Sequence, residues 1–355
     1  MDKRIGYLIT VAITATVAVP GIAQAATKRV LMGTPPGSQK AFEKTGSEVN
    51  AFFPSNIAIR AGDFVSFVPV GFHSIDLPAS GGPLALVSPT GKKVTAGDAA
   101  GMPFWFNQLD ELGFDKRLVR PRFGKTLNKG STRILSGLPL GPRLKPLRVR
   151  FGKPGLYTYF CNIHPGMRGT VRVRAKGTPV PSARGDAARV KKQAASALAV
   201  ARSLVKNTKP GAATVSVSAE GKGGVHHFGM IPGKLTVRAG TAVTFRMPRN
   251  ATDGHTATFG PGDALKKSSY LGAIAASFEG PAPDARGVYP SEQPGSPPAP
   301  LSSALHGNGF WNSGVMDADP RTPLPGANTV RFSTPGTYDY VCVIHPFMKG
   351  TVTVQ

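Results

Sequence analysis

Two segments of this chain repeat each other and set its organisation. Residues 156–173, LYTYFCNIHPGMRGTVRV, and residues 337–354, TYDYVCVIHPFMKGTVTV, are identical at 11 of 18 positions. Upstream, residues 57–67 match residues 235–245 in a similar way. Because repetition at a fixed spacing marks a duplicated structural unit, the sequence predicts two copies of one domain. We place the two copies at residues 27–175 and 212–355.

The repeated segments have the pattern of short β-strands. In the upstream segment of the first copy, Ile57, Ile59, Val65 and Phe67 recur at alternate positions on either side of an Ala-Gly-Asp turn. A Pro-Gly pair precedes the downstream strand in both copies. Alternation with period two and turns rich in Gly and Pro are typical of antiparallel β-sandwiches. The predicted fold class is therefore all-β, with two tandem sandwiches.

Between the two copies, residues 176–211 form a predicted linker that contains a helix. The flanks of this linker are rich in Pro, whereas residues 186–207 are rich in Ala. Five small or apolar side chains recur on one helical face, namely Val190, Ala194, Ala197, Ala201 and Leu204. Their spacing predicts a helical connector that packs on one domain through this face.

Both copies carry the spacing Cys-x-x-His-x-x-Met in the downstream segment. The residues are Cys161, His164 and Met167 in the first copy, and Cys342, His345 and Met348 in the second. Each copy also has a His upstream, His73 at 88 residues before its Cys and His255 at 87 residues before. Four of the seven His residues of the chain thus fall in the repeated pattern.

This set of residue types is the one that a type-1 (blue) copper ion requires. Such a site uses one thiolate, two imidazoles and a weak axial thioether. Sulfur ligands disfavour calcium and magnesium, and the lack of a second Cys in each copy disfavours structural zinc. A disulfide would have to join equivalent positions of two domains, so we interpret Cys161 and Cys342 as metal ligands. The alternative is ordinary packing by Cys and Met and solvated His side chains.

The downstream segments resemble the amicyanin-type copper loop of the plastocyanin/azurin family of cupredoxins. The resemblance rests on YDYVCVIHPFMKG at residues 338–350 and on CNIHPGM at residues 161–167. It implies a Greek-key β-sandwich and one-electron transfer between Cu(II) and Cu(I). It also implies that one copper is bound in each domain. The implied ligands are His73, Cys161, His164 and Met167 for one ion, and His255, Cys342, His345 and Met348 for the other.

The chain departs from small cupredoxins in two respects. Those proteins have Asn directly after the upstream His, whereas this chain has Ser74 and Thr256, which puts the second layer of contacts around the metal in doubt. The stretch between the upstream His and the Cys is also much longer than a small cupredoxin needs. Both inserts contain an aromatic-Asn element, at residues 104–107 and 310–313. We interpret these elements as packing elements.

Two other classes of protein remain as alternatives. Two cupredoxin domains also occur in copper nitrite reductases and two-domain laccases, where a His lies beside the copper-binding Cys and leads to a second copper centre. Here the residues beside the Cys are Phe160, Asn162, Val341 and Val343, so catalysis is the weaker interpretation. A copper storage or delivery protein is the third class, and a ligand set suited to retention argues against it.

The three His residues outside the repeated pattern are His226, His227 and His306. A further metal site would need several of them together. However, adjacent residues of a strand point to opposite faces, which separates the imidazoles of His226 and His227. We therefore expect all three to be surface imidazoles.

The N-terminus and the charge of the chain bear on its location and partners. Residues 1–26 combine a basic start, an apolar stretch and an Ala-Gln-Ala site, which is the pattern of a secretory signal peptide. We expect a secreted, periplasmic or cell-wall-associated protein without stable membrane insertion. The net charge is +24, and residues 116–150 hold eleven Lys or Arg and no acid. The simplest interpretation of this field is a solvated basic surface in a chain that is basic throughout. It could also attract an acidic redox partner or an anionic cell-wall polymer, whereas export argues against nucleic acid. Nothing in the sequence specifies an oligomeric state.

Overall fold

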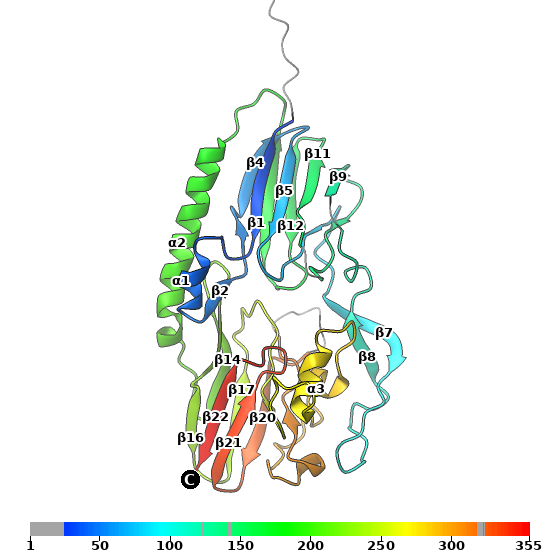
Figure 1. Cartoon of the computed structure of the whole chain (residues 1–355), viewed down its shortest axis with the longest axis vertical. Helices are drawn as coiled ribbons and strands as arrows, with labels where there is room; N and C mark the ends of the chain where they lie inside the picture. Colours follow the sequence, from blue (N-terminus) through cyan, green and yellow to red (C-terminus); the bar gives the residue numbers. More distant parts are fainter. Residues whose placement is uncertain (1–24, 123, 141–143, 318–321, 323) are drawn as a thin grey trace, which may run out of the picture.

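The computed structural model describes residues 25–122, 124–140, 144–317, 322 and 324–355. It contains two β-sandwiches, which lie one above the other in Figure 1, and each sandwich has two five-stranded sheets. The predicted all-β fold with two tandem sandwiches is confirmed. The predicted signal peptide, residues 1–26, lies outside the described residues except for its last two positions.

The first sandwich is formed by strands from the N-terminal half of the chain. One sheet has the order β3 (Phe52–Phe53), β1 (Thr27–Met32), β5 (Phe64–Pro69), β11 (Leu147–Phe151) and β9 (Gly124–Asn128). The other has the order β10 (Ile134–Leu135), β6 (Asp76–Leu77), β12 (Gly155–Phe160), β13 (Arg168–Arg174) and β4 (Asn56–Arg60). Because β12 and β13 pair as a hairpin, the loop between them emerges at one end of the sandwich.

The second sandwich repeats this arrangement in the C-terminal half. One sheet has the order β2 (Ser47–Val49), β15 (Val225–Ile231), β14 (Thr214–Gly221), β17 (Thr241–Arg246) and β20 (Ala327–Phe332). The other has the order β16 (Lys234–Val237), β22 (Lys349–Val354), β21 (Gly336–Val341), β18 (Thr258–Phe259) and β19 (Trp311–Asn312). Four strands of these sheets correspond, β3-β1-β5-β11 to β15-β14-β17-β20, whereas β9 and β2 lie at opposite edges. The register of the corresponding strands agrees, since Val30 lies opposite Phe67 and Val215 opposite Phe245 in parallel pairs.

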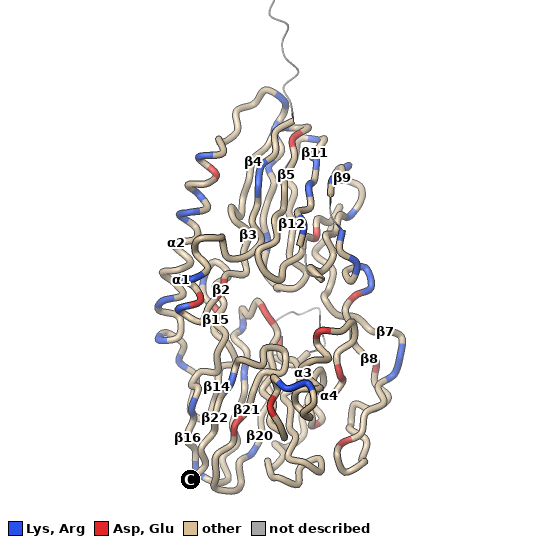
Figure 2. The backbone as a smooth tube through the Cα atoms, in the orientation of Figure 1, with Lys and Arg blue, Asp and Glu red and all other residues tan. Residues whose placement is uncertain are grey.

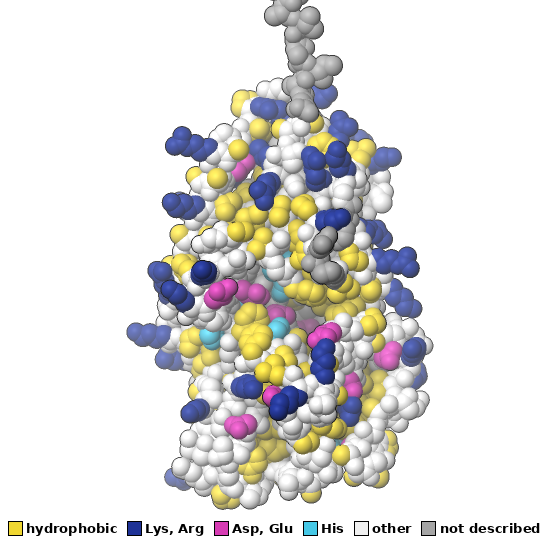
Figure 3. Space-filling model, in the orientation of Figure 1, with side chains coloured by type: hydrophobic (Ala, Val, Ile, Leu, Met, Phe, Trp, Pro, Cys, Tyr) yellow, Lys and Arg dark blue, Asp and Glu magenta, His cyan; other side chains and the backbone are white. Residues whose placement is uncertain are grey.

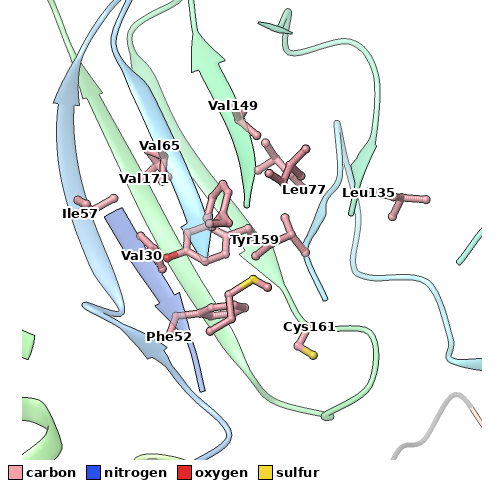
Figure 4. Packing of buried hydrophobic residues seen from close by; sticks show 14 of the residues in the cluster. Val30, Phe52, Ile57, Val65, Leu77, Leu135, Val149, Tyr159, Cys161 and Val171 are labelled. Carbon is pink, nitrogen blue, oxygen red and sulfur yellow. The ribbon is translucent and has the colours of Figure 1, made fainter. Parts of the chain in front are cut away.

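The core of the first sandwich explains the period-two pattern of its strands. Ile57, Ile59, Val65 and Phe67 are all at most 2% exposed and meet between the two sheets. Figure 4 shows this core around Tyr159, with Cys161 at its end where β12 runs into the loop. The core therefore fixes the strand end from which Cys161 enters the loop.

Strand β2 links the two sandwiches, because it belongs to residues 27–175 in sequence but to the second sandwich in space. It pairs antiparallel with β15, with Glu48 opposite His226 and Val49 opposite Val225. Short helix α1 (Gln39–Glu43) precedes it. The chain thus leaves the first sandwich after β1, adds a strand to the second, and returns at β3.

The predicted helical connector is present as α2 (Ala183–Asn207), which runs along one side of both sandwiches in Figure 1. Its N-cap is Ser182, whose hydroxyl accepts the N–H of Gly185, so the helix begins three residues before the predicted start. Ala194, Ala197, Ala201 and Leu204 are buried as expected. Among the helices of the described part of the chain, none is long and apolar enough to cross a bilayer.

The cluster beneath α2 contains residues from both halves of the chain. Its fully buried members are Phe42, Val49, Phe53, Ala194, Ala197, Ala201, Leu204, Ala219, Val225 and Ile231. They come from α1, β2 and β3 as well as from α2, β14 and β15. The helix therefore packs over a shared core, and not on one domain as the sequence suggested.

The two long inserts pack against each other on the opposite side. The first contains the hairpin β7 (Val87–Lys93) and β8 (Asp110–Phe114). The second contains α3 (Tyr270–Ser277), α4 (Ala285–Val288) and a turn of 3-10 helix at Leu305–Gly307. Phe104 and Phe310 are buried in one cluster between the inserts, with ring centroids 6.2 Å apart. The aromatic-Asn elements therefore have the packing role that the sequence predicted.

Candidate metal centres

Three of the side chains predicted for the first copper site come together at the end of the first sandwich. His73 follows β5, and Cys161 and His164 lie in the loop between β12 and β13. The Nδ1 atoms of His73 and His164 are 3.0 Å apart, and Cys161 Sγ lies 3.5 Å from His164 Nδ1. All three residues are at most 4% exposed. Two imidazole nitrogens and a sulfur therefore converge on one buried point.

The second sandwich has the same arrangement. His255 Nδ1 lies 3.1 Å from His345 Nδ1, and Cys342 Sγ lies 3.7 Å from the first nitrogen and 3.8 Å from the second. Cys342 and His255 are fully buried, whereas the side chain of His345 is 19% exposed. In both groups the three ligand atoms lie within 4.8 Å of one another.

The loops hold Met167 and Met348 in place through backbone hydrogen bonds. Cys161 N–H donates to Met167 O, and Met167 N–H donates to His164 O, at 3.0 and 3.1 Å. The equivalent bonds of the second loop, from Cys342 to Met348 and from Met348 to His345, are 3.0 and 2.8 Å. Both Met side chains are buried, at 3% and 2% exposure. The spacing Cys-x-x-His-x-x-Met is thus folded into one tight loop in each domain.

Ser74 and Thr256 directly follow the upstream His of each copy, and each contacts the Cys loop of its own domain. Their backbone N–H groups donate to the sulfur of Cys161 at 3.4 Å and of Cys342 at 3.3 Å. Their hydroxyls accept the N–H of the residue that follows each Cys, at 2.9 Å in both domains. A hydroxyl therefore joins the upstream His segment to the Cys loop and fixes the two relative to each other.

Burial keeps three of the four imidazoles neutral, which is the form that binds a metal. It lowers the pKa of His73 to about 4. It also lowers the pKa of His164 and of His255 well below the usual value, and neighbouring His charges add to the effect. For His345, burial lowers the pKa, but the charges of Asp253 and Cys342 outweigh it and raise the pKa to about 9.

His226 is buried rather than a surface imidazole, so the prediction for this residue was wrong. It is 0% exposed, and its Nε2 lies 3.1 Å from Nε2 of His255. On its other side, Nδ1 lies 2.6 Å from the carboxylate of Glu220. Burial lowers the pKa of His226, but the hydrogen bond and charge of Glu220 outweigh it and raise the pKa. No repeat pointed to His226, because β14 and β15 extend here beyond their counterparts in the first sandwich.

The other two unassigned His residues lie elsewhere. His227 points to the opposite face from His226, where Nδ1 lies 3.0 Å from the carbonyl oxygen of Thr45. His306 is in the second insert, beside Glu292 and Asp98. The structure therefore brings neither of them to His226, and the further site considered from these three residues is not formed.

The two candidate centres face one cavity between the sandwiches. It has a volume of about 590 Å³, and its lining includes His164 and Pro165 from one loop and His345 and Pro346 from the other. Glu48 and Asp253 also line it. In Figure 3, acidic and His side chains gather in this middle zone among apolar ones. The imidazoles of His164 and His345 thus line the same cavity.

Comparisons with known proteins find similarity over part of the chain. No family model matches the chain. Amicyanin-alpha of Methylorubrum extorquens is 43% identical over 58 residues, which are 15% of this chain and 49% of that protein. The chain thus spans about half the length of this curated relative.

Similar solved structures include a reduced Cu(I) form of an amicyanin mutant, at 20% identity over 43% of this chain and 90% of that chain, with a TM-score of 0.22. A mutant fern plastocyanin matches at 22% identity over 40% and 99%, with a TM-score of 0.21. Amicyanin from Paracoccus versutus matches at 17% identity over 43% and 89%, with a TM-score of 0.22. The amicyanin match in sequence supports a cupredoxin-like domain within this chain, and the two β-sandwiches described above are in keeping with it.

Proposed function

We propose that this chain is an exported electron-transfer protein with one type-1 copper site in each domain. The observation that carries the proposal is the duplication of the ligand group. Two His and one Cys meet in equivalent positions of two cupredoxin-like domains, with the same contacts from the neighbouring loop. Ordinary packing does not require two His and one Cys to meet in the same way in each half.

The donor set fits copper. His73, Cys161, His164 and Met167 would hold the ion of the first domain, and His255, Cys342, His345 and Met348 that of the second. When bound by such a set, copper exchanges one electron between Cu(II) and Cu(I). The chain contributes a rigid, dry setting, because the thiols accept N–H bonds from Ser74 and Thr256 and because both Cys residues are at most 2% exposed.

The cavity supports electron exchange between the two domains. His164 is 4% exposed and faces the cavity, so an external protein has little access to the first site through this imidazole. His345 is more open and lies beside Phe347, which is 61% exposed and contacts the ring of Phe228. We place the docking patch for a redox partner at Phe347 and Pro346, since an apolar patch around a ligand imidazole suits transient association.

The charge distribution supports an acidic partner. Lys and Arg are prominent on the first domain and along α2 in Figure 2, whereas several Asp and Glu lie toward the middle of the molecule. In the described part of residues 116–150, Lys116, Arg120, Arg122, Lys125 and Lys129 are exposed. Such a field increases the rate of association with an acidic protein. Export to the periplasm or the cell surface rests on the signal-peptide pattern of residues 1–26.

Metal analysis with visible and electron paramagnetic resonance spectra tests the proposal. The purified protein should bind two coppers with the strong visible absorption of a thiolate-copper bond. Cys161→Ser and Cys342→Ser should each remove one blue copper and leave the other. His227→Gln is the matched control, since His227 lies outside both groups and should leave two. The proposal fails if neither domain becomes blue, or if a Cys variant keeps both blue coppers.

A further inference from the structure

A buried series of hydrogen bonds runs away from the second centre. His255 has Nδ1 directed to Cys342 and His345, and its Nε2 lies 3.1 Å from Nε2 of His226. The planes of the two rings are within 6° of parallel. Nδ1 of His226 then lies 2.6 Å from Glu220 Oε1, and both side chains of this pair are 0% exposed. A carboxylate is thus connected to a predicted copper ligand through one imidazole.

The series is held firmly at its far end. The carboxylate of Glu220 accepts the backbone N–H of Thr252 at 3.0 Å, and it also lies within 3.3 Å of the Thr252 hydroxyl. Asn50 Nδ2 donates to the same hydroxyl at 3.0 Å. Asn50 directly follows β2, the strand that the first half of the chain adds to the second sandwich. This segment therefore helps to hold the carboxylate of Glu220 in place.

Metal binding would determine where the protons of this series lie. An imidazole that binds a metal through Nδ1 carries its proton on Nε2. Nε2 of His255 would then donate to Nε2 of His226, and His226 would carry its own proton on Nδ1 and donate it to Glu220. A hydrogen bond of this kind makes a metal-bound imidazole a stronger donor to the metal. A stronger nitrogen donor favours Cu(II) over Cu(I).

We infer that Glu220, acting through His226, lowers the reduction potential of the second centre relative to the first. The inference rests on the proposed function, because it requires a copper ion on His255. Glu220 and His226 are positioning residues in this scheme, since they act through His255. The consequence is a preferred direction for electrons, from the second domain to the first.

The described part of the first domain has no equivalent of this series. The chain turns away after β1 at Gly33, and a Cβ atom added there would lie 2.5 Å from Nε2 of His73. Among the described residues, Nε2 of His73 has no hydrogen-bond partner, whereas Nδ1 faces His164. Gly33 therefore leaves only backbone beside the imidazole where the second domain supplies His226.

A different role for the same residues would be a third metal site. Ligand atoms of His226, Asp253 and His255 lie within 4.8 Å of one another. Such a site would require Nε2 of His255 to lose its proton while Nδ1 of the same ring binds the copper of the second domain. The 3.1 Å distance between the two Nε2 atoms and the near-parallel rings are compatible with a shared proton. The metal content of variants distinguishes the two.

The test uses the full-length chain with Cys161→Ser, so that only the second centre holds a blue copper. Adding Glu220→Gln should raise the ratio of reduced to oxidised copper at a fixed applied potential by about tenfold, which is 59 mV for a one-electron couple. The visible absorption should persist. In the reciprocal Cys342→Ser chain, Glu220→Gln should leave the potential of the first centre unchanged.

We call the hydrogen bonds from Glu220 through His226 to His255 the relay. A double-mutant cycle separates the effect of this relay from the effect of losing a nearby charge. His226→Gln keeps an amide that can bond to Glu220 but interrupts the imidazole series. If the relay operates, Glu220→Gln should have little further effect in the His226→Gln background. If its effect is the same in both backgrounds, the carboxylate acts only as a charge and the inference is wrong.

Two further results would overturn the relay without depending on Glu220→Gln. In the Cu(I) protein, Nε2–H of His255 should give a slowly exchanging imidazole proton resonance shifted downfield, and its absence would contradict the hydrogen bond. A third metal ion that is lost in His226→Gln would make His226 a ligand. By contrast, a second domain that never binds blue copper would contradict the proposed function itself, whereas an unchanged potential in Glu220→Gln contradicts the relay alone.

Discussion

At the scale of single residues, His306 connects the two inserts. Its Nε2 lies 3.0 Å from Glu292 Oε1 and its Nδ1 lies 3.5 Å from Asp98 Oδ2, so one imidazole contacts a carboxylate from each insert. Its ring also contacts Phe104, with centroids 4.7 Å apart. Burial lowers the pKa of His306, but the hydrogen bonds and charges of Glu292 and Asp98 outweigh it and raise the pKa.

The raised pKa predicts a pH-dependent contribution of His306 to stability. A His whose pKa is higher in the folded chain stabilises it fully below the unfolded pKa of about 6.5, and this contribution is lost as pH rises through the folded pKa. His306→Gln should therefore destabilise the metal-free protein more at about pH 5.5 than at about pH 8.5. Denaturant unfolding at the two pH values measures the difference.

His227 provides a control with the opposite sign. Burial lowers the pKa of His227, so its contribution is present above the unfolded pKa and is lost as pH falls through the folded pKa. His227→Gln should therefore lose its effect at low pH, where His306→Gln has its largest effect. Parallel pH profiles for the two variants would contradict the assignment of these shifts.

The sequence predicted the candidate ligand residues because the two copies carry the same residue types in equivalent positions. Cys, His and Met recur at the same spacing in both copies, and the structure brings the Cys and His side chains together twice. The sequence could not indicate His226 or Glu220. Both lie in the extension of β14 and β15, which has no counterpart in the first copy, and their contact with His255 depends on a pairing distant in sequence.

At the scale of elements, α2 has the most specific requirements. Its buried face consists of Ala194, Ala197 and Ala201, followed by Leu204, and it lies on strands β14 and β15. The approach is close, since a Cβ atom added to Gly221 of β14 would lie 2.4 Å from Cγ1 of Val200. The absence of a side chain at Gly221 is therefore a condition of the position of the helix. The Ala-rich pattern predicted the helix and its face, but not that the face covers residues from both halves of the chain.

Ala201→Leu tests this close approach. Ala201 is 3% exposed, and extra methyl and methylene groups inserted into such a site cost about 1–3 kcal/mol of unfolding free energy. Ala199→Leu is the matched control, because Ala199 is exposed on the same helix and should change stability by less than about 0.5 kcal/mol. Equal effects of the two substitutions would show that α2 does not pack tightly through this face.

At the scale of the whole molecule, three connections hold the sandwiches end to end (Figure 1). Strand β2 pairs across the boundary, α2 lies over a shared core, and the inserts pack together on the opposite side. Repeats in the sequence predicted the two sandwiches, because the alternating apolar residues that form each core recur within each copy. The end-to-end arrangement was not predictable, since it depends on β2 and the inserts, which differ between the copies.

This arrangement places the two centres close enough to influence each other. The charges of His226 and His345 in the second domain contribute to the lowered pKa of His164 in the first. His164 and His345 also line the same cavity. Electrons should therefore pass between the two centres within one molecule, without dissociation and renewed docking.

Pulse reduction of the fully oxidised protein measures this exchange. A substoichiometric pulse should reduce the more accessible second centre first, and a slower phase should then move the electron to the first centre. Because both centres belong to one chain, the rate of the slower phase should not depend on protein concentration. Salt should affect this rate little, since no association of charged surfaces is needed. The Cys342→Ser chain should lack this phase. A rate proportional to protein concentration would mean that electrons pass only between molecules, and the shared cavity would then have no role in their transfer.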